Sequence, residues 1–249
     1  MRILPTISIV RVSFLVLLTA FASVATPVRA TNVQVVVPNS KDGFAGIGNT
    51  LPFSRLPARY QQLNFATEFS QITGPSLITE VAFRAGPTAN PFTHTVANLQ
   101  LNLSTAAVTP LSGSYTANVG SDDTVVFAGP LAMDVVSPKT GGVRPFEIVM
   151  PLSTPFLYDP SAGDLLLDLR IIDNPNGSEA GFVDSLTIPL VLARVYCSSG
   201  CSVDDSGGIT DGGFLITRFD FAPEPGSGLA GAVAILALGM AARARACPS

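Results

Sequence analysis

Apolar and polar residues alternate strictly along residues 97–104, whose sequence is Ala-Asn-Leu-Gln-Leu-Asn-Leu-Ser. Neighbouring side chains of a β-strand point to opposite faces, so this period of two predicts a strand. Its apolar face would carry Ala97 and the three leucines, and its other face would be wetted by the amides. Residues 164–171 and 218–221 alternate in the same way, with charged residues opposite the apolar ones.

Short apolar runs of the same kind occur at residues 33–37, 60–65, 78–85, 124–127, 146–152 and 188–196. Clusters of Gly, Pro, Asn, Asp and Ser, such as residues 173–178, break both helix and strand between them. No segment between the two ends of the chain keeps the 3.6-residue period of an amphipathic helix. We therefore predict one all-β domain at residues 31–222, a two-layer antiparallel β-sandwich of jelly-roll type. An up-and-down barrel or a pair of small sandwiches is the alternative.

The N-terminal segment has the composition of a signal peptide. Two arginines precede an apolar stretch at residues 14–25, and Ala30 stands at a position that a signal peptidase recognises. We predict that residues 1–30 are a signal peptide cleaved after Ala30. Cleavage after Ala25 is the alternative, and an uncleaved anchor is disfavoured because the apolar stretch is shorter than the ~18 residues of a membrane span.

At the other end, a run without charge extends from Gly226 to Ala242 and is followed by Arg243 and Arg245. A helix of this length rises about 25 Å, which is enough to cross a thin bilayer. The two arginines would hold the C-terminal end on the cytoplasmic side and leave the rest of the chain outside. We therefore predict a C-terminal hydrophobic helix that anchors the chain in a membrane. The alternative, a core helix that closes the domain, would normally show a polar face.

The motif Pro223-Glu224-Pro225 stands immediately before this run. Pro-Glu-Pro, a Gly/Ala/Leu-rich hydrophobic segment and a basic cluster, in this order, resemble the PEP-CTERM sorting signal of bacterial exported proteins. The resemblance covers residues 223–249, about a tenth of the chain. It implies that an exosortase-type processing enzyme acts on the tail after transient membrane insertion, and that the protein reaches the cell surface or the extracellular space through a membrane-anchored precursor. The chain departs from the pattern in the four residues after Arg245, because such tails often stop on the basic cluster.

A weaker resemblance lies inside the domain. Three stretches are similar to a segment of uncharacterised PEP-CTERM β-sandwich proteins, to which no chemistry attaches: residues 59–62, 68–70 and 81–84. On physical grounds Gln61, Gln62 and Arg84 either line a polar groove or form the solvated face of neighbouring strands. We expect the solvated face.

The middle of the chain is more acidic than the whole. All 18 acidic residues lie between Asp42 and Glu224, whereas five of the 14 basic residues lie in the two terminal segments. Residues 31–225 therefore carry a net charge of −9, against −4 for the whole chain. Such a surface repels phosphate backbones, so we predict no nucleic-acid partner. It suits a soluble extracellular domain, or one that collects divalent cations.

Calcium is the one ion that the composition favours. Oxygen ligands cluster on turn-forming backbone at Asp122-Asp123 and around a Ser-Gly-Gly sequence at Asp204, Asp205 and Asp211. Neither segment follows an EF-hand pattern, and acids that form water-exposed turns are the more common finding. We therefore predict no cofactor, with calcium at the second cluster as the alternative.

Cys197 and Cys201 flank a three-residue turn, and the third cysteine belongs to the tail. We predict that the pair forms a disulfide, as expected in an oxidising compartment. A zinc site is disfavoured because the pair supplies only two ligands and His94 is the only histidine.

No catalytic constellation is evident. A Ser-His-Asp triad would need His94, and the sequence has no G-x-S-x-G elbow. A glycoside hydrolase needs two facing carboxylates, for which the candidates are Glu68, Glu80, Glu147 and Asp168. Acids that alternate with apolar residues on a strand most often lie on its outer face. We expect core positions, rather than sugar stacking, for Tyr60, Tyr115 and Tyr158.

Two export signals without a catalytic constellation favour a protein that is not an enzyme. We expect an exported or surface-displayed β-sandwich that associates with extracellular polysaccharide or biofilm matrix, or that serves in adhesion. The alternative is a secreted glycoside hydrolase that depends on two carboxylates.

Overall fold

The computed structural model describes residues 32–53, 57–174, 183–189, 191–197, 202–204 and 206–222. The predicted signal peptide and the predicted tail lie outside these residues, the tail with Pro223, Glu224, Pro225, Arg243 and Arg245. Within the described ranges, no helix is long and apolar enough to span a membrane.

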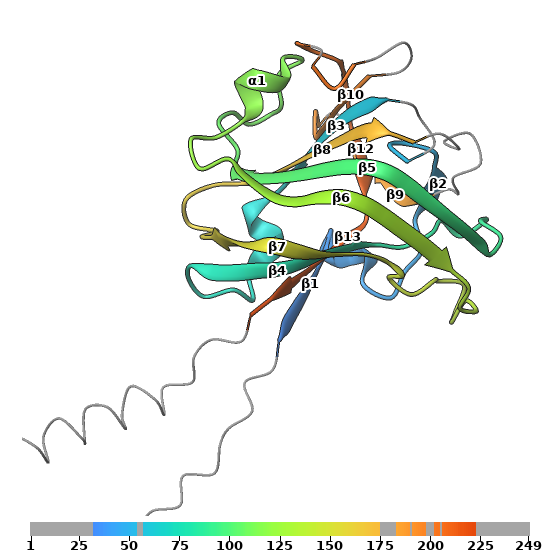
Figure 1. Cartoon of the computed structure of the whole chain (residues 1–249). Helices are drawn as coiled ribbons and strands as arrows, with labels where there is room; N and C mark the ends of the chain where they lie inside the picture. The colour runs from blue at the N-terminus through green and yellow to red at the C-terminus, as the bar shows by residue number, and fades with distance from the viewer. Residues whose placement is uncertain are drawn as a thin grey trace, which may run out of the picture. The chain divides into compact units, whose positions relative to one another are not determined.

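The described residues form antiparallel sheets, which confirms the all-β prediction (Figure 1). The four-stranded sheet has the order β1 (Val33–Val37), β13 (Thr217–Phe221), β4 (Ser76–Phe83), β7 (Ile148–Tyr158). The six-stranded sheet has the order β11 (Ile209–Asp211), β10 (Arg194–Tyr196), β3 (Ala58–Asn64), β8 (Leu165–Asp173), β5 (Phe92–Thr105), β6 (Thr124–Val135). The three-stranded sheet is β12 (Gly213–Leu215), β9 (Val183–Thr187), β2 (Ile47–Asn49). Three short helical segments connect strands: η1 (Asn39–Lys41), η2 (Ala66–Phe69) and α1 (Tyr115–Asn118).

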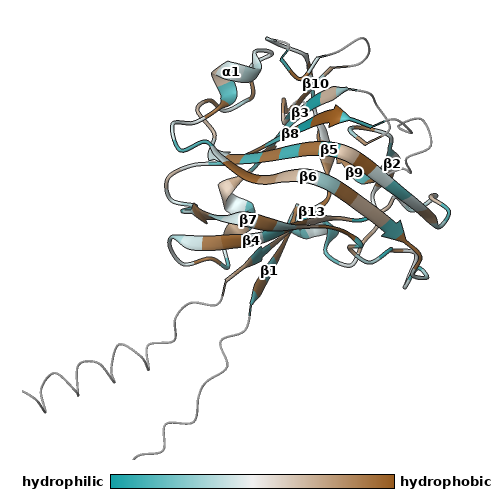
Figure 2. Ribbon diagram, in the orientation of Figure 1, coloured by the Kyte–Doolittle hydropathy of each residue, from teal (hydrophilic) through white to brown (hydrophobic). Residues whose placement is uncertain are grey.

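The two larger sheets contribute their apolar faces to one hydrophobic cluster. The alternation at residues 164–171 and 218–221 predicts these faces correctly, because Leu169 of β8 and Phe219 of β13 are fully buried. Figure 2 shows apolar and polar positions alternating along β5 and β8. Phe69 of η2 packs in this cluster against the four-stranded sheet, with ring centroids 4.9 Å from Tyr158 and 5.4 Å from Phe219.

Two strand predictions are wrong in part. Ala97 is exposed, not buried with the leucines, because the pairing of β5 with β6 shifts between Val96 and Leu99. A β-bulge of this kind adds residues to one strand and turns the following side chains over. Of the predicted run 188–196, only Arg194–Tyr196 is a strand among the described residues.

A second, smaller cluster covers part of the outer face of the six-stranded sheet. The segment between β5 and β6 carries α1 over this face, and its residues pack there with strand residues: Leu63, Leu111, Tyr115, Leu166 and Val195. The expected burial of Tyr60, Tyr115 and Tyr158 is confirmed. The expectation of a face wetted by amides is wrong for Asn102, which is buried.

Replacement of Phe69 by alanine tests the central packing. We expect F69A to lower the free energy of unfolding by about 3–5 kcal/mol, because it leaves a cavity among aromatic rings. Phe44, which is 68% exposed, provides the matched control. F44A should change the free energy of unfolding by less than about 0.5 kcal/mol. Urea unfolding measures both, and equal effects would contradict this packing.

Candidate binding face on the six-stranded sheet

Six polar residues form two rows across β3, β8 and β5 on the face opposite the main core. Strand register places Arg170 opposite both Arg59 and Gln100, and it places Asp168 opposite both Gln61 and Asn102. Alternation requires all six side chains to point away from the main core. We call this set the polar grid: Arg59, Gln61, Gln100, Asn102, Asp168 and Arg170.

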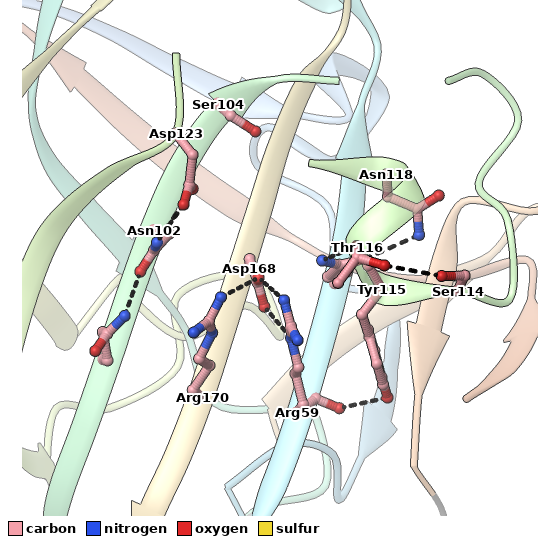
Figure 3. A network of polar contacts seen from close by, with 12 residues as sticks. Arg59, Asn102, Ser104, Ser114, Tyr115, Thr116, Asn118, Asp123, Asp168 and Arg170 are labelled. Carbon is pink, nitrogen blue, oxygen red and sulfur yellow. Dashed lines mark hydrogen bonds and ion pairs between the residues drawn. The ribbon is translucent and has the colours of Figure 1, made fainter. Parts of the chain in front are cut away.

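Asp168 is the centre of the polar grid (Figure 3). It is 1% exposed and accepts hydrogen bonds from Arg59 Nε at 3.0 Å and Nη2 at 2.6 Å. Arg170 Nη2 donates to the same carboxylate at 3.2 Å. A cation–π contact also fixes Arg59, whose guanidinium carbon lies 4.7 Å from the Tyr115 ring centre. The Arg170 side chain keeps 27% exposure, although its Nε is buried without a hydrogen-bond partner. It is therefore held in place while part of it still meets solvent.

A chain of amides extends from the polar grid towards the start of β6. Gln100 Nε2 donates to Asn102 Oδ1 at 2.7 Å, and Asn102 Nδ2 donates to the two oxygens of Asp123 at 3.1 and 2.9 Å. These bonds fix the orientation of both amides. Asp123 is exposed and Gln100 is half-buried. The arrangement presents ordered donors and acceptors at the surface, which is what recognition of a ligand rich in hydroxyls requires.

The α1 segment closes the opposite side of the polar grid. Tyr115 Oη donates to the backbone carbonyl of Arg59 at 3.1 Å, and Asn118 Nδ2 donates to Gln61 Oε1 at 2.9 Å. Gln61 Nε2 in turn donates to the backbone carbonyl of Tyr115 at 3.1 Å. The accessible part of the polar grid is therefore the side that carries Arg170 and Gln100.

The prediction that Gln61, Gln62 and Arg84 form a solvated face is wrong, because all three are buried in different places. Gln62 lies inside the domain, where its Oε1 accepts a hydrogen bond from Leu215 N at 2.7 Å. Arg84 pairs with Asp184 at 2.8 Å, and both side chains are buried. Only Gln61 belongs to the polar grid.

The four candidate carboxylates of a glycoside hydrolase have separate partners. Glu68 accepts a hydrogen bond from Asn39 N, and Glu147 accepts one from Ser137 N. Asp168 is buried in the polar grid, which corrects the expectation of an outer, solvated position. His94 is buried too, with Nε2 2.7 Å from Asn174 Oδ1.

The fourth candidate, Glu80, meets a carboxylate that sequence reasoning missed. Its partner across the strands is Asp220, and Arg218 between them hydrogen-bonds to both. Burial and the neighbouring Asp220 raise the pKa of Glu80 above its ordinary value, although Arg218 acts against them. The two residues are 140 positions apart, so only the strand register brings them together.

The carboxylate of Asp211, one of the candidate calcium ligands, already accepts hydrogen bonds from other residues of the protein. Arg194 donates to its two oxygens at 2.8 and 2.5 Å, and Gly213 N donates at 2.7 Å. Burial would raise the pKa of Asp211, but the hydrogen bonds from Arg194 and Gly213 outweigh it and the pKa is lowered. Asp205 lies outside the described residues, and within them no three Asp, Glu, His or Cys gather as metal ligands. In the other acidic turn, Asp122-Asp123, the Asp122 carboxylate accepts a hydrogen bond from Thr105 N.

Cys197 is disulfide-bonded. Cys201 lies outside the described residues, so its pairing with Cys197 stays a prediction.

No protein-family model, no curated protein and no solved structure matches this chain.

Substitution of Asp168 by asparagine tests the centre of the polar grid. We expect D168N to destabilise the fold by about 3 kcal/mol, because it leaves the buried Arg59 guanidinium without a counter-charge. D134N is the matched control at an exposed position of β6 and should cost less than about 0.5 kcal/mol. Chemical denaturation of both variants gives the comparison, and a stable D168N would contradict the role assigned to this carboxylate.

Substitution of Glu80 by glutamine tests the carboxylate pair. Because the folded-state pKa is raised, the folded protein holds this proton more tightly than the unfolded chain does, and the wild type loses stability as pH rises through that pKa. The melting temperature of E80Q relative to wild type should therefore rise between about pH 4 and about pH 7. A difference that falls over this range would contradict the shift.

Proposed function

We propose that this chain is a non-enzymatic exported protein, displayed at the cell surface or released, that associates with extracellular polysaccharide. Its C-terminal tail would be sorted through Pro223-Glu224-Pro225 and the hydrophobic helix by an exosortase-type enzyme. The open side of the polar grid would form the polysaccharide contact. The observation that carries this proposal is the row formed by Arg170 and Gln100, whose side chains are half-exposed. Strand pairing and side-chain hydrogen bonds hold the planar groups of this row in fixed positions.

We also propose that the domain is a two-layer jelly-roll sandwich. Two observations support this: the single hydrophobic cluster to which both larger sheets contribute, and the order of their eight principal strands. In chain order these strands are β1, β3, β4, β5, β6, β7, β8 and β13. If these eight strands are numbered 1 to 8, the two sheets have the orders 1-8-3-6 (β1-β13-β4-β7) and 2-7-4-5 (β3-β8-β5-β6). Two interleaved Greek keys of a jelly roll have these orders.

The chemistry of the open side suits sugar hydroxyl groups. Arg170 supplies only donors, Asp123 supplies only acceptors, and the Gln100 amide supplies both. Val125, exposed and paired with Asn102, adds an apolar surface beside them. Because these side chains are already ordered, little side-chain entropy is lost on binding. Tyr115, which contacts Arg59 on this side of the sheet, is fully buried, so hydrogen bonding rather than ring stacking would carry the contact.

Two substitutions on the open side test the binding proposal. R170A combined with Q100A should weaken retention of the full-length protein on polysaccharide from its own host at least about tenfold, because two to three hydrogen bonds of about 1 kcal/mol each are lost. The D134N variant, altered at a distant exposed carboxylate of the same sheet, should bind as wild type does. Affinity electrophoresis compares them, and unchanged retention of the double variant would exclude this face.

A further inference from the structure

One arginine differs from the other arginines that the structure describes. Among the residues that the structure describes, five arginines form ion pairs with carboxylates: Arg59, Arg84, Arg170, Arg194 and Arg218. Arg144 is the sixth described arginine, and no described acidic side chain lies within ion-pair distance of it. Residues 31–225 carry a net charge of −9, so this exception is unexpected.

Arg144 is also buried, at 5% exposure. Its Nη1 donates to the backbone carbonyl of Ser137 at 2.8 Å, and its Nη2 donates to that of Ala89 at 2.7 Å. Its Nε is buried and has no hydrogen-bond partner. Carbonyl dipoles orient a guanidinium but do not neutralise it, and an unpaired buried charge is costly. Each Nη carries a second N–H beyond the one that bonds a carbonyl, so the side chain can still donate to an anion.

A cavity of about 640 Å³ opens at this arginine, in the loop that joins β6 to β7. Its wall includes Ser137 and Thr140 together with the apolar residues Pro138, Val143 and Pro145. Thr140 and Val143 exchange two backbone hydrogen bonds, at 2.8 and 3.0 Å, which fix the tip of the loop. The nearest acid in the sequence, Glu147, accepts a hydrogen bond from Ser137 N through Oε1, and its Oε2 is buried without a hydrogen-bond partner. It does not form an ion pair with Arg144.

We propose that this cavity binds the carboxylate-bearing ring of an acidic sugar, a hexuronate. The planar guanidinium matches a carboxylate, the two hydroxyl side chains match ring hydroxyls, and the proline and valine side chains can pack against C–H groups of the ring. A volume of about 640 Å³ lies within the usual range for small-ligand sites and exceeds what a simple anion needs. The inference rests on the proposed association with polysaccharide, and it names an acidic polymer as the ligand.

The test uses the full-length protein and three probes: a hexuronate oligosaccharide, the same oligosaccharide with its carboxyl groups reduced to alcohols, and inorganic phosphate. Titration calorimetry should show binding of the acidic oligosaccharide, at least about tenfold weaker binding of the reduced one, and no comparable binding of phosphate. Equal binding of the acidic and the reduced oligosaccharide would overturn the carboxylate assignment. Equal binding of phosphate would overturn the hexuronate assignment.

Two variants of the loop locate the site without depending on the buried arginine. Thr140 is exposed, so T140E and T140Q should both fold, and they differ only in charge. T140E should weaken binding of the acidic oligosaccharide at least about tenfold at low salt, whereas T140Q should stay within about twofold of wild type. R144Q should lose binding where its melting curve shows that it is folded. Identical affinities of T140E and T140Q would overturn the location.

The two proposals fail in different ways. If the R170A/Q100A double variant loses retention on polysaccharide while T140E binds every probe as wild type does, the hexuronate site is wrong and the proposed function stands. If the wild-type protein retains neither acidic nor neutral polysaccharide, the proposed function is wrong, and the inference about its ligand is wrong with it.

Discussion

The four-stranded sheet depends on its last strand. β13 pairs with β1 on one side and with β4 on the other, and β1 and β4 do not pair with each other. Residues that close the sheet are therefore separated by almost the whole domain, with Val33 opposite Phe221. Contacts of such long range form late and slowly in folding. The sheet can be completed only when Thr217–Phe221, the last strand of the domain, has been synthesised.

Period-two alternation predicts the inward faces well, because burial against a core is a local requirement on each strand. Leu169 and Phe219 follow it, whereas Ala97 does not, since a bulge shifts the register and leaves no mark on the alternation itself. The outward faces were predicted less well. Asn102 and Asp168 look like solvated residues in the sequence, but both are buried. Arg59 and Arg170 hydrogen-bond to Asp168, and Asn102 is bonded to Gln100 and Asp123.

The polar contacts could not be predicted because they depend on register and on long-range packing. Glu80 meets Asp220 only through the pairing of β4 with β13, and Arg59 meets Asp168 only through the pairing of β3 with β8. The buried state of Arg144 has no sequence signal either, since a basic residue between Val143 and Pro145 is typical of an exposed loop. Five of the six described arginines pair with carboxylates through contacts that only the folded chain brings together, and Arg144 is the exception.

Every functional conclusion depends on the domain working outside the cell. The direct test is intact-mass analysis of the protein from its native host, after separation of medium, cell-surface and membrane fractions. The account predicts that protein from the medium or the surface lacks residues 1–30 and the residues that follow Pro225. Protein that stays in the membrane fraction with Arg243 and Arg245 still present in its mass would contradict processing of the tail and with it the proposed route to the matrix.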